Sequence, residues 1–457
     1  MSQGLPLPRR FWAILAISFG NALTTTDGSI VNVALPTIAH DLHVESSAVV
    51  LLVTTYQLIM VMTLLPLANL GDRIGHRRLY QTGLLIFTAG AVLAFFARSL
   101  PFLIVVRSVQ AVGAAASLSV SSAMLRTIYP ASQLGRGLGV NSVVVSCSAA
   151  IAPTVSGLIL TFAHWPWIFA AAVPFGLISL AFGRALPDPE PHDKPFDFLG
   201  AALCAASFGL VIAGAQSAVQ GDSPVISAAI VVAGFIIGFY FVRRELHEPR
   251  PILPVDLLTQ PTFALSALAG FIAFAATVTF TLWLPFRLQH GYGFTPPEVG
   301  AVLAPWPLTF AVISPLSGSL SDRIPAGLLG AIGLTVAAGA LLLIAMLPAH
   351  PGYFDIVWRI VLLGVGLGFF FSPNNRLIIG SAPIERSAAA GGIITTARSF
   401  GQTSGATLVS VLLATSLGAT AAPAIVAAGL AVIGAICSAV RLRPALRMPA
   451  FEEVEEF

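Results

Sequence analysis

Residues 68–78 have the sequence Ala-Asn-Leu-Gly-Asp-Arg-Ile-Gly-His-Arg-Arg, and this stretch decides the fold because part of it returns later in the chain. Residues 318–323 are Gly-Ser-Leu-Ser-Asp-Arg. Each copy lies between the second and third hydrophobic runs of a group of six. Glycine permits a tight turn, and the acid and arginines can pair with one another or with nearby helix ends. A solvated, positively charged loop is the plainer alternative, but two copies at matching places favour an internal repeat.

The composition around the two copies is typical of a membrane protein. Of the 457 residues, 56% are hydrophobic and only 9% are charged, whereas soluble domains carry roughly 25% charged residues. The mean hydropathy is +0.89. So few charges cannot cover a soluble surface, and we predict an all-α polytopic membrane protein. The net charge of +3, without a basic cluster, indicates no nucleic-acid partner.

Fourteen hydrophobic runs are long enough to cross a bilayer, which takes about 20 residues in a helix. Their predicted bounds are 11–34, 48–67, 79–96, 101–124, 138–162, 167–183, 198–216, 225–242, 262–285, 299–320, 326–347, 356–371, 388–417 and 423–440. The first run could instead be a signal peptide, because Arg9 and Arg10 precede it. Apolar sequence resumes after its polar interruption and no convincing cleavage site follows, so we expect a retained span.

The positions of Lys and Arg predict the orientation. With the amino terminus in the cytoplasm, all but five of these residues fall on the inner side, as the positive-inside rule requires. The outer side holds Arg98, Arg287 and Arg359, and Arg107 and Arg398 lie within spans. Both termini are therefore expected in the cytoplasm.

Two inner linkers, the first of them rich in proline, divide the spans into groups of six, two and six. We predict an amino-terminal six-helix bundle over residues 1–186 and a carboxy-terminal six-helix bundle over 262–445. Linkers and two additional transmembrane helices occupy 187–261, and an acidic cytoplasmic tail occupies 446–457.

At residues 68–78 the chain resembles the major facilitator superfamily, whose signature loop is Gly-x-Leu-x-Asp-Arg-x-Gly-Arg-Arg or close to it. Residues 107–113, Arg-Ser-Val-Gln-Ala-Val-Gly, are similar to its fourth-span Arg-x-x-Gln-Gly-x-Gly element. Residues 152–157, Ala-Pro-Thr-Val-Ser-Gly, resemble the fifth-span Gly-Pro-x-x-Gly-Gly element of its antiporters, with two glycines replaced. Residues 26–36, Thr-Asp-Gly-Ser-Ile-Val-Asn-Val-Ala-Leu-Pro, resemble the first span of its fourteen-span drug:proton antiporters. The resemblance implies the major facilitator fold: two six-helix bundles plus two extra central helices.

Asp27 is the acidic residue that lies well inside a predicted span, where an ionisable group is expensive unless it is paired, hydrated or protonated. Counting about 1.5 Å per residue along each helix places Asp27 and Arg107 at similar depth. The resemblance makes the first and fourth spans neighbours, so we expect these two side chains to meet. Either Asp27 is the proton-coupling acid, tuned by Arg107, or the pair is structural and joins the two spans.

Polar and aromatic side chains within spans are predicted to line a substrate cavity. They are Asn32, Tyr56, Gln57, Gln110, Phe280, Trp283, Phe370, Asn374 and Arg398. Ordinary packing is the alternative for each aromatic ring, because aromatic side chains fill helix interfaces. For Arg398 the alternative is a structural bond to neighbouring backbone.

Conformational gating is predicted for the repeated loops and for the fifth span. The residues are Asp72, Arg73, Gly75, Arg77, Pro153, Gly157, Asp322 and Arg323. The resemblance places Asp72 near the start of the thirteenth span, around Ser387 and Ala388, where it would complement the positive helix end. Stabilisation of the turn alone is the alternative role for Asp72. Pro153 and Gly157 are expected to bend the fifth span.

These features favour a secondary active transporter in a bacterial plasma membrane, one that exports small amphipathic compounds, cationic or lipophilic, in exchange for protons. It is expected to be a monomer with three partners: a small-molecule substrate, protons and the lipid bilayer. No phosphate-binding loop is present, so the proton gradient is the expected energy source, with no cofactor and no metal. A transporter specific for one metabolite or organic anion is the alternative. A membrane enzyme or sensor is disfavoured because the sequence has no catalytic motif.

Overall fold

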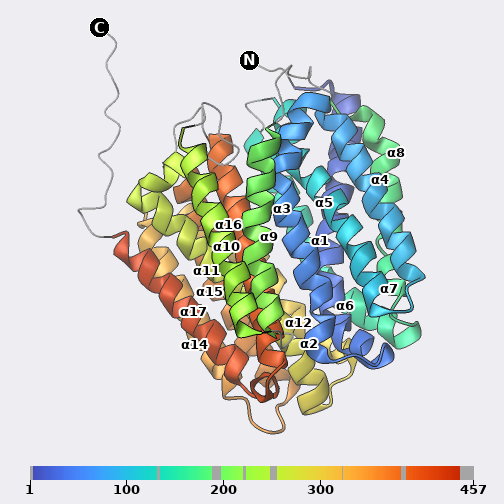
Figure 1. Ribbon diagram of the computed structural model, residues 1–457, viewed down its shortest axis with the longest axis vertical. Coiled ribbons are helices and arrows are strands. Elements are labelled where there is room, and N and C mark those ends of the chain that lie inside the picture. The colour runs from blue at the N-terminus through green and yellow to red at the C-terminus, as the bar shows by residue number, and fades with distance from the viewer. Residues whose placement is uncertain are drawn as a thin grey trace.

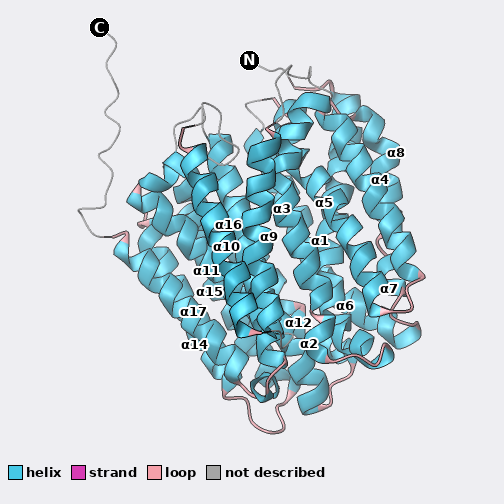
Figure 2. Ribbon diagram, viewed as in Figure 1, coloured by secondary structure: helices cyan, strands magenta, loops and turns pink. Residues whose placement is uncertain are grey.

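The computed structural model describes residues 4–130, 134–187, 197–219, 223–247, 255–321, 323–381 and 387–442. Every regular element in these ranges is helical (Figure 2), which confirms the all-α prediction for them. The helices run up and down one long bundle (Figure 1). We call the end of the bundle where the first helix begins the proximal end, and the opposite end the distal end.

The amino-terminal part of the bundle contains eight α-helices. They are α1 (Leu7–Asp41), α2 (Ser46–Val49), α3 (Leu51–Ile74), α4 (His76–Phe95), α5 (Leu100–Ile128), α6 (Leu134–Phe162), α7 (Trp167–Ala170) and α8 (Val173–Phe182), followed by the short 3-10 helix η2 (Gly183–Ala185).

Two central helices, α9 (Phe198–Val219) and α10 (Pro224–Glu245), precede the carboxy-terminal part. That part begins with η3 (Val255–Thr259) and continues through α11 (Pro261–Phe286), η4 (Arg287–Gly291), α12 (Pro296–Leu303), α13 (Pro305–Leu320), α14 (Ala326–Ala345), α15 (Tyr353–Gly380), α16 (Ser387–Leu413), η6 (Ser416–Ala419) and α17 (Ala422–Val440).

The fourteen predicted runs each fall on a single helix or on consecutive short ones. Most ends agree to within a few residues, but α1, α3 and α15 extend seven to nine residues beyond the predicted ends at 34, 67 and 371. The predicted tenth run, for example, is divided into α12 and α13 just before Pro305. Proline fits the first turn of a helix but disrupts the turn before it. Eleven helical segments in the described ranges are long and apolar enough to cross a membrane. The count of fourteen spans, the cytoplasmic termini and the domain boundaries stay predictions.

The internal repeat is visible as a helix contact that occurs twice. Helices α4 and α14 each contain 20 residues, and α14 begins 250 residues after α4. A Cβ atom on Gly83 of α4 would lie 2.7 Å from the carbonyl oxygen of Gly113 in α5. The same contact joins α14 to α15, where a Cβ atom on Gly333 would lie 2.6 Å from the carbonyl oxygen of Gly366. Only glycine lets these backbones approach so closely.

The two halves share one hydrophobic core at the distal end and have separate cores at the proximal end. The shared cluster includes Ile38, Val49, Leu288 and Val299, from helices of both halves. At the proximal end, one cluster belongs to the amino-terminal half and another to the carboxy-terminal half. The halves are therefore held together distally.

Two hydrogen bonds between the halves add to this distal closure. Gln289 Nε2 donates to the Val33 carbonyl oxygen at 3.2 Å. Ser410 Oγ donates to the Ser47 carbonyl oxygen at 3.1 Å. Both bonds cross the boundary between the halves, so separating the halves at this end would break them.

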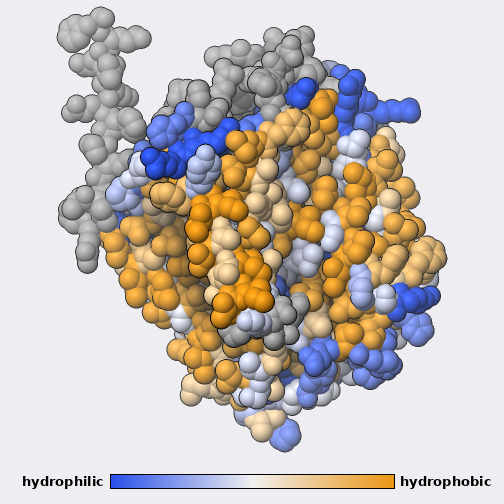
Figure 3. All heavy atoms as spheres, viewed as in Figure 1, coloured by the Kyte–Doolittle hydropathy of each residue, from blue (hydrophilic) through white to orange (hydrophobic). Residues whose placement is uncertain are grey.

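The outer surface suits a lipid environment. Apolar side chains cover much of the face seen in Figure 3, including α9 and α10, and hydrophilic residues gather toward its ends. Phe235, Phe239 and Tyr240 on α10 are each more than half exposed. Apolar surface of this extent is unfavourable in water and favourable in a bilayer. The chain is therefore a multi-pass membrane protein.

Candidate functional site

A buried ion pair joins α1 to α5. Arg107 Nη1 lies 2.5 Å from Asp27 Oδ2, and the two side chains are 1% and 0% exposed. The structure thus brings together the two charged side chains that were expected to meet because they lie at similar depths in neighbouring spans. A charge pair in such a place must be tightly bonded, because each ion has lost its hydration.

Arg107 has three further neighbours. Its Nη1 also donates to Gln110 Oε1 at 3.2 Å, one turn along α5. Its guanidinium carbon lies 4.2 Å from the centre of the Tyr56 ring on α3 and 5.7 Å from the centre of the Phe169 ring on α7. Aromatic faces attract a guanidinium cation, and more strongly away from water. Four helices therefore position this one arginine.

Several polar atoms of predicted site residues in the amino-terminal half lack a hydrogen-bond partner within the described part of the chain. They are Asp27 Oδ1, Asn32 Oδ1, Gln57 Oε1, Arg107 Nε and Gln110 Nε2. Buried polar atoms are nearly always paired with protein or ordered water. The pair therefore retains bonding capacity for a proton, a water molecule or a substrate.

The aromatic residues predicted for the cavity from the carboxy-terminal half lie in the apolar core. Phe280, Trp283 and Phe370 are at most 1% exposed and belong to the hydrophobic cluster that the two halves share. Trp283 Nε1 donates to the Gly418 carbonyl oxygen at 3.0 Å, which fixes α11 against η6. These contacts are the ones expected if the three aromatic side chains pack in the helix interfaces. A role of these residues in binding substrate stays a prediction.

Asn374 takes part in a buried polar network that the sequence did not reveal. Arg441, at the end of α17, donates from Nη1 to Asn374 Oδ1 and to Ser266 Oγ, both at 2.7 Å. It also donates from Nη2 to Ser438 Oγ, and Asn374 Nδ2 donates to the Ser266 carbonyl oxygen at 3.1 Å. From sequence, Arg441 counted only as an inner-side charge, since nothing in the pattern showed that its side chain turns inward.

The first repeated loop forms a local turn. Gly75 has φ of +99°, a conformation that residues with a Cβ atom rarely adopt. Asp72 Oδ1 lies 2.9 Å from His76 Nε2, and the Asp72 side chain is 61% exposed. Arg73 is exposed and Arg77 is half-buried. This arrangement agrees with a role in the turn, and the contact expected between Asp72 and the start of α16 stays a prediction.

The remaining gating and cavity residues fall in three places. Arg323 is exposed beside the second repeated loop, where Asp322 lies outside the described residues. Arg398 is half-buried on α16. Pro153 and Gly157 lie in α6, where it meets α12 of the other half. A Cβ atom on Gly157 would lie 2.8 Å from the Pro296 carbonyl oxygen, so this element forms a close contact between the halves.

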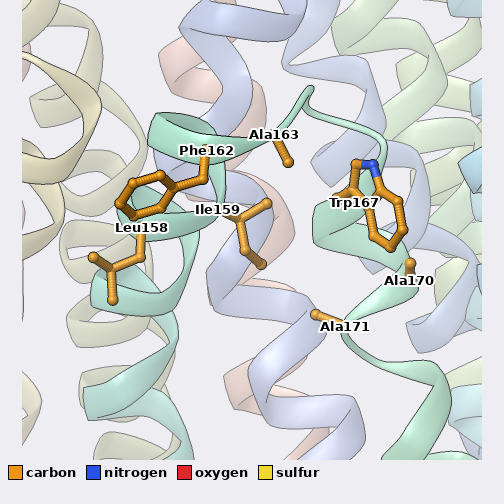
Figure 4. A pocket seen from close by; sticks show the side chains of 7 residues that line it. All are labelled: Leu158, Ile159, Phe162, Ala163, Trp167, Ala170 and Ala171. Atoms are coloured by element: carbon orange, nitrogen blue, oxygen red, sulfur yellow. The ribbon is translucent and has the colours of Figure 1, made fainter.

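An apolar groove with a volume of about 410 Å³ opens on the side of the bundle between α6 and α7 (Figure 4). It is lined by Leu158, Ile159, Phe162, Ala163, Trp167, Ala170 and Ala171. Phe162 is 85% exposed and Trp167 is 51% exposed. The groove is lined by apolar side chains alone and faces outward, whereas the Asp27–Arg107 pair is charged and buried.

Comparison with known proteins places this arrangement in a family. A model of the Major Facilitator Superfamily matches residues 17–406. An uncharacterized transporter of Escherichia coli (strain K12), YebQ, is 43% identical over 96% of this chain and 97% of its own. The riboflavin transporter RibZ of Clostridioides difficile (strain 630) is 29% identical, covering 90% of each chain. The multidrug efflux pump LfrA of Mycolicibacterium smegmatis (strain ATCC 700084 / mc(2)155) is 28% identical over 89% of this chain and 82% of its own.

Solved structures share the fold at low sequence identity. A bacterial homologue of the human lysosomal transporter Spinster, in an inward-facing and unoccupied conformation, superimposes with a TM-score of 0.70 at 15% identity, covering 95% of this chain and 97% of that one. A POT family transporter in complex with a thioalcohol-conjugated peptide gives a TM-score of 0.73 at 14% identity, covering 95% and 96%.

Proposed function

Because the chain belongs to the Major Facilitator Superfamily and is therefore a secondary transporter, we propose that it exports small amphipathic compounds, cationic or lipophilic, in exchange for protons. Its place is among the fourteen-span drug:proton antiporters of the bacterial plasma membrane. The observation that carries the proposal is the fully buried Asp27–Arg107 pair with its unpartnered polar atoms.

The chemistry of this pair suits exchange. Leaving one partner of a buried ion pair uncompensated costs about 3–5 kcal/mol. A proton on Asp27 removes its negative charge, and a bound cation replaces Arg107 as the partner of that charge. The two ligands therefore compete for one carboxylate, and competition for a shared site couples the movement of one to the movement of the other.

The distal contact between the halves supports alternating access. With both termini in the cytoplasm, distal closure corresponds to a transporter that is shut toward the outside. The Gln289 to Val33 and Ser410 to Ser47 bonds would break when the outer side opens. Helix α6 and the opposing α12 then separate at Gly157 and Pro296.

Gradient-driven uptake by proteoliposomes tests the proposal. Vesicles with an acidic lumen should accumulate ethidium when they contain the protein, and a protonophore should abolish the accumulation. Asp27→Asn should reduce gradient-driven accumulation at least tenfold in variant protein that is purified in folded form, because an amide has nearly the shape of the acid but does not exchange a proton.

Asp355→Asn is the matched control, since Asp355 also forms an ion pair, with Arg359, but lies partly exposed at the start of α15. It should transport as the wild type does. Normal gradient-driven uptake by folded Asp27→Asn would remove Asp27 from the mechanism, and wild-type uptake that ignores the gradient would refute proton coupling.

A transporter specific for one metabolite is the second candidate, and the likeness to a riboflavin transporter over 90% of each chain favours it. The same vesicles distinguish the two. Broad uptake of structurally unrelated lipophilic cations supports multidrug exchange. Saturable uptake of riboflavin with no uptake of such cations supports the specific transporter.

A further inference from the structure

The side chain of Gln216 on α9 is a buried amide. It is 9% exposed, and neither its Oε1 nor its Nε2 has a hydrogen-bond partner within the described residues. An amide buried in this way costs about 1–3 kcal/mol. A cost of that size calls for a ligand that the protein itself does not supply.

Helix α9 covers the line where the two halves meet. It packs against α3 of the amino-terminal half and α16 of the carboxy-terminal half, and these two helices also pack against each other. Figure 1 shows α9, in green, between α3 and α16. The Phe208 ring on α9 meets the Phe400 ring on α16 edge to face, with ring centres 3.9 Å apart. A Cβ atom on Gly209 would lie 3.0 Å from the Met62 methyl carbon on α3.

The helical period gives the direction of Gln216. It follows Gly209 by seven residues, which is nearly two full turns, so the two positions share one face of α9. That face meets α3. Gly214, by contrast, lies on the opposite face, because its Cβ atom would touch Val231 of α10. Gln216 therefore points inward, toward the junction of α3 and α16.

The seven-residue separation from Gly209 also gives the depth of Gln216 in the bundle. Helices α3 and α9 run in opposite directions, so moving seven residues distally along α9 corresponds to moving seven residues back along α3, from Met62 to Thr55. Each shift is about 10 Å. Thr55 precedes Tyr56, whose ring contacts Arg107. Gln216 thus lies at the level of the Asp27–Arg107 pair.

We propose that Gln216 lines the substrate pathway and binds the polar edge of the transported compound. The inference rests on the proposed function. An amide offers one acceptor and two donors side by side, so it suits a planar compound with hydrogen-bonding groups along one edge. The Phe208 and Phe400 rings, two turns proximal, provide an apolar surface for the rest of the molecule.

Thiol modification tests the lining without any substrate. In a background where Cys147, Cys204 and Cys437 are replaced by alanine, Gln216→Cys should react at least tenfold faster with a small cationic methanethiosulfonate reagent than Ser207→Cys. Ser207 is the matched control because it is 3% exposed on the same helix but lies against Gly238 of α10. Equally slow reaction at both positions would overturn the proposal.

Transport kinetics test the binding role. Gln216→Leu should raise the KM for ethidium, which carries amino groups, about tenfold, the effect of one hydrogen bond of about 1.4 kcal/mol. Its kcat for ethidium should be unchanged, as should its KM for tetraphenylphosphonium, which has no hydrogen-bonding group. Its Tm should not fall.

Equal changes in KM for both cations, or a lowered Tm with both KM values unchanged, would contradict the binding role. The two proposals fail separately: loss of proton coupling leaves the thiol result intact, whereas unreactive Gln216→Cys leaves the Asp27 result intact.

Discussion

At the scale of single residues, two arginines are buried in different surroundings. Asp27 and Arg107 are bonded to each other inside the bundle. Arg441 is bonded to neutral oxygens on three helices. In the first case our proposal is that a proton or a cation takes the place of Arg107 at the Asp27 carboxylate. In the second, the partners are fixed side chains of the fold, so the network stabilises the carboxy-terminal half without offering a site.

A double-mutant cycle should separate charge pairing from packing at the first site. Arg107→Leu leaves a carboxylate buried without its partner and should destabilise the protein by about 3–5 kcal/mol. Adding Asp27→Asn should recover most of that loss, because no uncompensated charge remains. Thermal unfolding in detergent measures both variants.

Arg359→Leu serves as the control for this cycle, since its partner Asp355 is partly exposed. It should cost less than Arg107→Leu, because the carboxylate that it leaves without a partner is 33% exposed and can be hydrated. Strict additivity of the Asp27 and Arg107 substitutions would show that the buried pair is not energetically coupled.

At the scale of elements, an ion pair joins the proximal ends of α9 and α10. Arg244 near the end of α10 donates to both carboxylate oxygens of Asp197, at 2.7 and 3.0 Å, just before α9 begins. Burial alone would raise the pKa of Asp197, but the bonds from Arg244 and from the Gly200 N–H outweigh it and leave the pKa of Asp197 below its ordinary value. The charged form is thus stabilised by folding.

The junction of α9 and α10 should therefore loosen in acid. A carboxylate with a lowered pKa contributes stability above its unfolded value, near 3.9, and loses it as the pH falls through the folded value. Asp197→Asn should lower the Tm at pH 6, and the difference from wild type should be smaller at about pH 3.5, below the unfolded pKa. A difference that stays constant between these pH values would contradict the assignment.

At the scale of the whole molecule, the two halves are held together distally and have separate cores proximally. At the distal end, two glycines allow the backbones of α6 and α12 to approach closely. The backbones of α6 and α12 meet at Gly157 and at Gly300, whose Cβ atom would lie 2.4 Å from the Pro153 carbonyl oxygen. The predicted antiporter element of α6 therefore forms part of the surface along which the halves close.

Filling this contact should open the distal end. Gly157→Leu places a side chain where α12 lies and should speed modification of a thiol at Ser410→Cys, which is 2% exposed in the wild type, about tenfold. That change corresponds to about 1.4 kcal/mol of shifted equilibrium.

Gly429→Leu is the control for this experiment, since a side chain there would meet open space. It should leave the labelling rate at Ser410→Cys unchanged. Equal rates in the two glycine variants would mean that α6 and α12 do not determine distal closure.

The sequence predicted those features that depend on distance along the chain. Hydrophobic length located the helices, and counting from the loops gave Asp27 and Arg107 the same depth. It did not predict features that depend on rotation about a helix. Whether Trp283 faces a cavity or a carbonyl group, and whether Arg441 turns inward, is decided by packing between helices distant in sequence. Gln216 needed both kinds of information, since its depth and its direction follow from contacts at Gly209 and Phe208.

The glycine contact of α4 with α5 is repeated between α14 and α15, so it can be used to match positions in the two halves. The matched positions differ in residue type. Aligning the halves on this contact sets Ile360 opposite Arg107. At this position one half thus carries the buried arginine, and its twin carries an isoleucine on the same scaffold. A substitution at this position of the carboxy-terminal half would therefore alter the packing of the bundle without removing either member of the Asp27–Arg107 pair.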